Sequence, residues 1–311
     1  MRNDVRGAGA APSLTSSEIL AATRGINAVT GVETEEWGSY PGPHMTVERI
    51  WELRTRIQEH LARPEVVGVV VTHGTDTLEE SAYLMARSLP PDKPIVFTGA
   101  MRTMSDLGWD GPANLLEAVQ VAASPEMRGF GSMVSMSGQI FAGLDATKTN
   151  THLLDAFESP GFGSLGVLDE GELILSRELP TYPPIVQPKE LATPVDIIFV
   201  AAGSDARLLD ASRKDARGVV IAAMGRGNVP PAVVPGIERW VADGKPVVLT
   251  SRTQGGRVGH TYGYAGGGRR LEEIGAIFGG SKRAQQARID LMLGLGAGMS
   301  TGELRTMFRD A

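Results

Sequence analysis

The fold is decided by residues 66–80, which read VVGVVVTHGTDTLEE. The apolar run at 66–71 is almost entirely β-branched, which is typical of a strand buried on both faces of a parallel sheet. Residues 77–80 have the spacing of a capping box, which begins a helix that we expect to continue through Met85 or beyond. A second apolar run at 94–98 predicts the next strand and completes a β–α–β unit.

The alternation of strands and helices continues on both sides of this unit. Upstream, we expect a helix over Thr46 to Ala62. Downstream, the helix predicted at 112–123 has one apolar stripe. A strand pair comes next at 131–136 and 139–141, with Ser137-Gly138 at the turn.

A proline-rich stretch at 181–188 predicts a linker, because three prolines within six residues do not fit inside a regular element. Beyond it we expect strands at 195–201, 218–223 and 246–250, a helix at 230–243 and a closing helix at 284–294. The predicted fold class is α/β with two α/β domains, a larger N-terminal one with a mostly parallel sheet and a smaller C-terminal one. We place them at 1–180 and 195–311, with a linker at 181–194.

Composition narrows the possible functions. The chain has 311 residues, 42 % of them hydrophobic and 21 % charged, which is ordinary for a globular protein. A net charge of −6 argues against nucleic acid or an anionic membrane as the main partner. There are no cysteines, and the five histidines lack metal-ligand spacing. The sequence has no apolar run of about eighteen residues, and its start lacks the apolar core of a signal peptide.

The chemistry is expected where the strands of the parallel sheet end. The turn at 72–76 lies there, and its N–H groups with the helix start behind them favour a carboxylate or a developing oxyanion. Asp76 and Thr77 can equally serve as simple helix caps. The loop at 99–102 comes after the neighbouring strand, although its glycine alone is weak evidence. Lys148 can be a surface charge, or a base if it is removed from water.

Taken together, these segments resemble the successive signatures of the asparaginase/glutaminase family. The resemblance covers nearly the whole chain, and its most specific part is the THGTDT segment. The matching segments are THGTDT at 72–77 with Glu79 and Glu80, GAMR at 99–102, DGPANL at 110–115, TKTNT at 147–151, FESP at 157–160 with Gly166, GRGNVP at 225–230 and SR at 251–252.

The resemblance implies a proton relay of Thr75, Lys148 and Asp76 that acts on a side-chain amide. Lys148 takes a proton from Thr75, while Asp76 orients the lysine and holds the amino group of the substrate. Ala100 offers a backbone carbonyl, and Gly74 belongs to the same binding turn. The reaction is expected to pass through a threonine acyl-enzyme that water hydrolyses.

The resemblance also implies L-asparagine as the substrate, with L-glutamine as a second candidate, and neither metal nor cofactor. A homotetramer or homodimer in the cytoplasm is expected. Two weaker alternatives stay open. One is a non-catalytic homologue that binds an acidic amino acid. The other is the glutaminase subunit of a tRNA amidotransferase, which normally comes with an added N-terminal module.

The chain departs from the family pattern at its start. Family members begin with a strand and a Thr-Gly-Gly-Thr-Ile-Ala-like turn, whose first threonine is generally taken as the acylated nucleophile. No such segment exists here, and residues 1–20 resemble the mobile loop and the helix that come after that turn in relatives. Met1 is therefore expected to be either an internal methionine taken as the start, which we favour, or the start of a shortened homologue. Loss of a first strand would expose a buried sheet edge.

Two further departures concern binding residues. Where relatives have a Ser-Gln pair for the substrate carboxylate, this chain has Gly42-Pro43, so we expect backbone contacts there and Ser39 as a substitute. The segment 281–288 has glutamine where lysine is common and no obvious glutamate for a neighbouring subunit.

Overall fold

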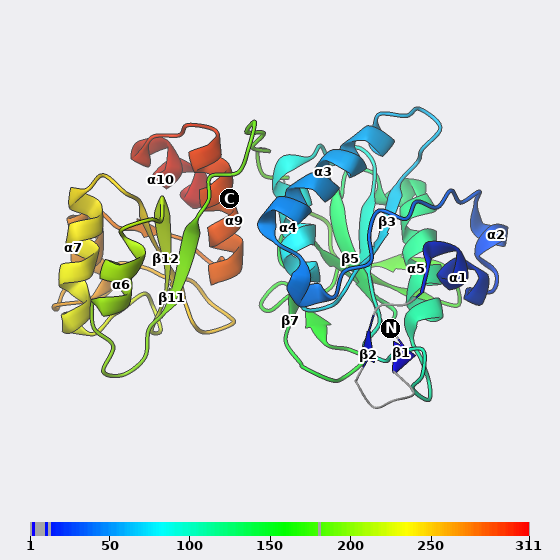
Figure 1. Ribbon diagram of the computed structural model, residues 1–311, viewed down its shortest axis with the longest axis horizontal. Coiled ribbons are helices and arrows are strands. Elements are labelled where there is room, and N and C mark those ends of the chain that lie inside the picture. Colours follow the sequence, from blue (N-terminus) through cyan, green and yellow to red (C-terminus); the bar gives the residue numbers. More distant parts are fainter. Residues whose placement is uncertain (1, 4–9, 12–13, 180–181, 311) are drawn as a thin grey trace. The chain divides into compact units, whose positions relative to one another are not determined.

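The structure is a computed structural model that describes residues 2–3, 10–11, 14–179 and 182–310. The chain divides into two compact units, Met1–Ile185 (unit 1) and Val186–Ala311 (unit 2). Unit 1 contains a large sheet and unit 2 a smaller parallel sheet, so the predicted α/β class is confirmed (Figure 1). The expectation for Met1 and the start of the predicted linker at Thr181 lie outside the described residues.

The large sheet of unit 1 has the strand order β10-β9-β6-β5-β4-β3. Its strands are β3 (Val69–Thr72), β4 (Ile95–Thr98), β5 (Ser132–Met136), β6 (Gln139–Ala142), β9 (Gly166–Asp169) and β10 (Glu172–Leu175). The first three run parallel and the others antiparallel. Because Thr72 pairs with Thr98, the turn after β3 and the loop after β4 leave the sheet side by side.

The smaller elements of unit 1 surround this sheet. Two short ladders lie outside it, β1 (Arg2–Asn3) with β2 (Ala10–Ala11) and β7 (Thr147–Lys148) with β8 (Phe157–Glu158). The helices are α1 (Ser16–Ala22), α2 (Ile26–Val29), α3 (Val47–Leu61), α4 (Leu78–Ser88) and α5 (Gly111–Ala123), with 3-10 turns η1 (Gly42–His44) and η2 (Pro125–Met127). The predicted β5–β6 hairpin is confirmed, with positive φ at Ser137 (54°) and Gly138 (75°).

Two details of the deciding stretch differ from expectation. The strand begins at Val69 rather than Val66, and its apolar residues are half-buried rather than buried on both faces. Within the described residues β3 pairs with β4 alone, which leaves its other edge open. The predicted capping box is also wrong, because the Thr77 hydroxyl donates to the carbonyl of Gly42 at 2.8 Å and makes no capping bond to the helix.

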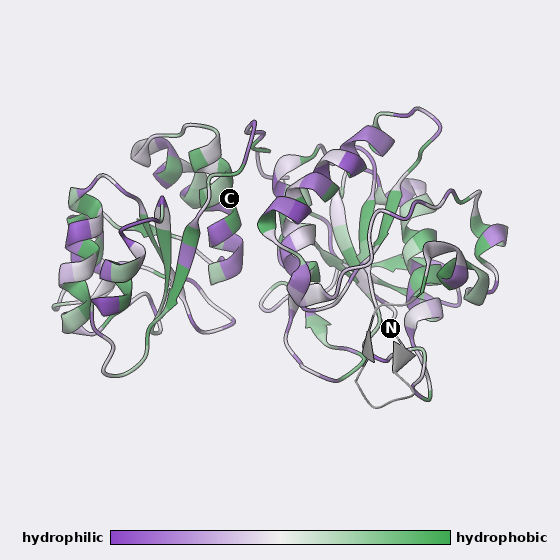
Figure 2. Cartoon of the chain, viewed as in Figure 1, coloured by the Kyte–Doolittle hydropathy of each residue, from purple (hydrophilic) through white to green (hydrophobic). Residues whose placement is uncertain are grey.

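The core of unit 1 lies on both faces of the sheet. Val96 packs with Ala118 and Val121 of α5. The next residue, Phe97, points to the opposite face, as neighbours in a strand must, and its ring lies 6.0 Å from that of His73. Figure 2 shows hydrophobic residues along the strands and mainly hydrophilic ones along α3.

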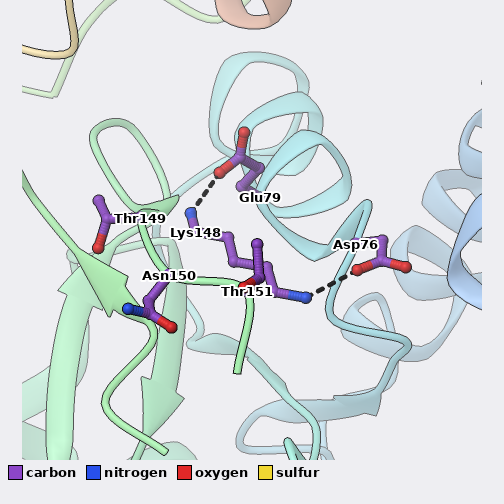
Figure 3. A pocket seen from close by; sticks show the side chains of 6 residues that line it. All are labelled: Asp76, Glu79, Lys148, Thr149, Asn150 and Thr151. Atoms are coloured by element: carbon purple, nitrogen blue, oxygen red, sulfur yellow. Dashed lines mark hydrogen bonds and ion pairs between the residues drawn. The ribbon is translucent and has the colours of Figure 1, made fainter. Parts of the chain in front are cut away.

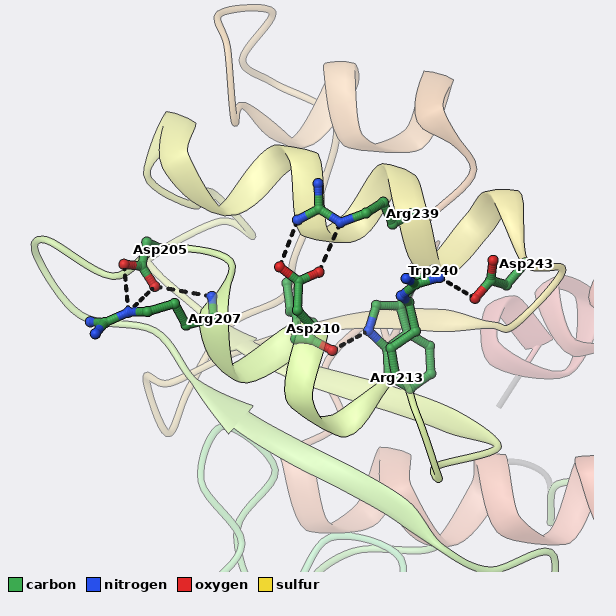
Figure 4. A network of polar contacts seen from close by, with 8 residues as sticks. Asp205, Arg207, Asp210, Arg213, Arg239, Trp240 and Asp243 are labelled. Atoms are coloured by element: carbon green, nitrogen blue, oxygen red, sulfur yellow. Dashed lines mark hydrogen bonds and ion pairs between the residues drawn. The ribbon is translucent and has the colours of Figure 1, made fainter.

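Unit 2 is a parallel sheet in the order β11-β12-β13-β14. Its elements are β11 (Val195–Phe199), α6 (Arg207–Ser212), β12 (Gly218–Ala223), η3 (Pro231–Val233), α7 (Val234–Ala242), β13 (Val247–Ser251), α8 (Gly268–Ile274), β14 (Ile277–Phe278), α9 (Ala284–Gly296) and α10 (Thr301–Asp310). Trp240 is fully buried and donates to the Leu209 carbonyl, while Arg239 binds both oxygens of Asp210 (Figure 4). We expected α9 to be the closing helix of the chain. This expectation is wrong, because α10 comes after it.

Replacing Phe97 with alanine should lower the free energy of unfolding by about 3–5 kcal/mol, because a fully buried ring leaves a cavity that the sheet cannot close. Urea denaturation measures this loss. Phe162→Ala is the matched control, since that ring is 51 % exposed and should cost less than about 1 kcal/mol. Equal losses in the two variants would contradict the burial of Phe97 in the core.

Candidate active site

The structure brings three predicted residues together at the edge of the large sheet. Thr75 and Asp76 lie in the turn between β3 and α4, and Lys148 lies on β7. The Lys148 Nζ donates to Thr75 Oγ1 at 2.8 Å and to Asp76 Oδ1 at 2.7 Å. One amine therefore bonds a hydroxyl and a carboxylate at the same time. Figure 3 shows the bond to the carboxylate of Asp76.

The two partners of this ion pair differ in exposure. The Lys148 side chain is 17 % exposed and that of Asp76 is 57 % exposed. Water screens the exposed carboxylate, so the pair itself adds little stability. Its effect is geometric, because it directs the amine toward Thr75 and leaves the second Asp76 oxygen available for another cation.

An open cavity of about 300 Å³ lies directly beside this pair. The residues that line it have polar or charged side chains: Asp76, Glu79, Lys148, Thr149, Asn150 and Thr151. Figure 3 shows these side chains arranged around the loop that carries the lysine. The size and the polar lining suit a small zwitterion better than an apolar ligand.

The predicted carboxylate-binding residues are in direct contact with the turn. A Cβ atom at Gly74 would lie 2.7 Å from the backbone nitrogen of Gly42, and a Cβ at Gly42 would lie 3.2 Å from the Cβ of Asp76. Both positions therefore favour glycine, because a side chain would push the two backbones apart. Pro43 is the next residue in η1 and is exposed, as is Ser39.

The loop that contains Ala100 is held on the other side of the turn. A Cβ at Gly99 would lie 2.6 Å from the His73 carbonyl oxygen, which shows how closely the two segments pack. The Asp110 carboxylate accepts hydrogen bonds from the backbone N–H groups of Met101 and Arg102, at 3.0 and 2.9 Å.

Asn114 completes this clamp. Its Nδ2 donates to the Gly99 carbonyl at 2.9 Å and to Asp110 at 3.0 Å, and its Oδ1 accepts from Ser137 N. The DGPANL motif contains both Asp110 and Asn114, but the sequence indicated no role for either. Their separation by four positions at a helix start places them on one face and was the available signal.

His73 lies next to the relay but points away from it. Its Nδ1 bonds the Gly74 carbonyl at 2.7 Å, and its Nε2 bonds Ser81 Oγ at 3.0 Å. Burial lowers the pKa of this imidazole below its usual range. The ring is therefore neutral near pH 7 and supports the turn from within.

Among the described residues, no group of three or more histidine, aspartate or glutamate side chains is placed to hold a metal ion. Within the same part of the chain, no helix is long and apolar enough to cross a membrane.

Comparison with known proteins finds a matching family model for each of the two units. The family model described as asparaginase, N-terminal, matches residues 1–181, and that of the glutaminase/asparaginase C-terminal domain matches residues 194–308. A probable L-asparaginase from Deinococcus radiodurans is 39 % identical over 284 residues, which are 89 % of this chain and 86 % of that protein. An L-asparaginase from Bacillus licheniformis is 32 % identical over 252 residues, which are 81 % of this chain and 78 % of that protein.

A solved structure agrees with these matches. The crystal structure of a probable cytoplasmic L-asparaginase from Campylobacter jejuni has a TM-score of 0.88 and 27 % sequence identity to this chain. The similarity covers 95 % of this chain and 94 % of that one.

His73 should make stability fall as the pH drops below about 6.5, the usual pKa of an exposed histidine. The unfolded chain binds a proton there and the folded chain does not, because the folded pKa is lowered by burial. Urea denaturation between pH 7.5 and 5 should therefore show a steeper loss for the wild type than for His73→Gln. His152→Gln, which changes an exposed ring, should keep the wild-type slope. A wild-type slope in His73→Gln would show that the buried imidazole is charged.

Proposed function

The chain belongs to the asparaginase family, and we propose that it is an amidohydrolase that converts L-asparagine to L-aspartate and ammonia. The observation that carries this proposal is the Lys148 amine bonded to both Thr75 and Asp76 beside a polar cavity. In the structure the Lys148 amine donates to the Thr75 hydroxyl. Once Lys148 has given up a proton, the same hydrogen bond can run from the hydroxyl to the amine, and the amine can then accept the Thr75 proton during attack on the amide.

We assign the proton transfers of the reaction to Thr75, Lys148 and Asp76. The Thr75 hydroxyl passes its proton to the neutral Lys148 amine as the Thr75 oxygen bonds to the amide carbon of the substrate. Lys148 returns this proton to the amide nitrogen, the C–N bond breaks and ammonia leaves. Water then attacks the threonine ester by the same route, which releases aspartate and restores the hydroxyl.

The same residues account for substrate binding. The exposed Asp76 oxygen that does not bond Lys148 is placed to hold the ammonium group of an amino acid. The backbone of Gly42 lies against the turn, and its N–H would bind the substrate carboxylate together with the N–H groups at Gly74 and the start of α4. Pro43 has no N–H and would only shape this side of the binding site. The Ala100 carbonyl faces the same binding turn in this proposal.

We extend the proposal to assembly and domain limits. A homotetramer or homodimer in the cytoplasm fits the family, and the similar Campylobacter jejuni protein is named as cytoplasmic. L-glutamine is the second substrate to test. We keep the domain limits at 1–180 and 195–311 with the linker between them.

Removing the lysine amine should abolish the reaction without unfolding the protein. We expect Lys148→Met and Thr75→Val each to lower kcat for ammonia release by about 10²–10⁴-fold, the usual contribution of a positioned base. Lys214→Met is the matched control, because that lysine is exposed in unit 2. Wild-type rates in Lys148→Met would refute the relay.

The assay should test L-glutamine as well as L-asparagine. It should compare the 311-residue chain with a version that carries any residues that its gene encodes upstream of Met1. Acid quenching during turnover, with peptide mass mapping afterwards, identifies the threonine that carries the acyl group. If every version binds L-aspartate in a calorimetric titration but releases no ammonia, the non-catalytic alternative holds instead.

A further inference from the structure

The Lys148 amine meets Thr75 only if the backbone that carries it is held against α4. β7 contributes two residues to a ladder with β8, and this ladder is separate from the large sheet. The register of the large sheet therefore fixes the turn that holds Thr75 and Asp76 but does not fix β7. A second connection has to set the distance between them.

The Glu79 carboxylate makes that connection. Its Oε2 accepts from the Lys148 backbone N–H at 2.6 Å and from the Thr147 hydroxyl at 2.5 Å. Both donors are part of β7, and Glu79 lies in the first turn of α4, three residues after Asp76. Figure 3 shows Glu79 bonding one end of Lys148 while Asp76 bonds the other.

From this arrangement we propose that Glu79 is a positioning residue, which fixes the Lys148 backbone so that the amine reaches Thr75. The inference rests on the proposed proton relay. The charge of Glu79 suits its place, because the first turn of a helix favours a carboxylate. The turn before α4 carries the Thr75 hydroxyl, and the first turn of the same helix thus sets the position of Lys148.

A second set of bonds fixes the far side of the β7–β8 ladder. Asp145, three residues before Lys148, accepts from Ser159 Oγ at 2.5 Å and from Arg177 Nη2 at 3.0 Å. These contacts hold the ladder within unit 1 but do not touch the turn that holds Thr75. Glu79, by contrast, bonds the β7 backbone directly from the first turn of α4.

The first test distinguishes the loss of the two hydrogen bonds to Glu79 from the loss of its negative charge. Glu79→Ala removes both hydrogen bonds and should lower kcat for L-asparagine about 10–100-fold with KM within about threefold, because a small displacement of the amine disfavours proton transfer. Glu79→Gln keeps an acceptor oxygen and should restore kcat to within about fivefold of the wild type. Glu80→Gln, one residue along the same helix turn, is the matched control. Thermal melting checks that each variant folds.

A second variant tests the contact between α4 and β7 from the β7 side. Thr147→Val keeps the buried shape but removes the hydroxyl that donates to Glu79. We expect it to lower kcat, and to add little to the loss in Glu79→Ala when the two are combined, because both remove one interaction. Additive losses, or a Glu79→Gln variant as slow as Glu79→Ala, would overturn the positioning role.

A third measurement does not depend on catalysis, so it tests the role of Glu79 separately from the proposed hydrolysis. Trace acetylation with peptide mass spectrometry reports the reactivity of each lysine. Lys148 should react several times faster in Glu79→Ala than in the wild type, relative to the exposed Lys214, and should stay unchanged in Glu80→Gln. Unchanged labelling overturns the role of Glu79 even if the enzyme is active. A wild type without ammonia release, but with the expected labelling change, refutes only the hydrolysis.

Discussion

The bond from the Lys148 amine to Thr75 is the interaction on which the rest of the candidate site depends. The two residues are 73 positions apart, and a lysine side chain left to itself samples many conformations. The amine can serve one hydroxyl only if both backbones are held. The large sheet holds the first through β3 and β4, and the Glu79 carboxylate of α4 bonds the backbone that carries the second.

Close backbone contact is the second constraint, and glycine satisfies it. Gly42 lies against Gly74, and Gly99 lies against the carbonyl of His73. Any larger residue at Gly74 or Gly99 would force the two neighbouring segments apart. The turn is thus enclosed by the η1 segment on one side and by the loop after β4 on the other.

The first turn of α4 concentrates the chemistry in few residues. Thr75 and Asp76 precede it, Thr77 bonds the η1 segment, and Glu79 bonds β7. A helix start favours negative charge through its free N–H groups, which suits the two carboxylates here and the carboxylate group of a substrate beside them. His73 supports this turn from the core side as a neutral ring, so its proximity to the relay is structural.

The sequence by itself determined the β–α–β unit at 66–98, the β5–β6 hairpin and the family. Each of these depends on a pattern among residues that are close together in the chain: the period of the apolar residues, the residues of a turn, or a short motif. The sequence misjudged the burial of β3 and the cap of α4, since both depend on distant partners: the strands available for pairing and the carbonyl of Gly42. The family resemblance predicted that Lys148 acts on Thr75, and the tertiary structure supplied the distance between them. Only the tertiary structure decided that Asp110 clamps the loop of Ala100 and that Glu79 bonds β7. The physical reason is that these contacts join segments far apart in the chain, and local pattern carries no distance between them.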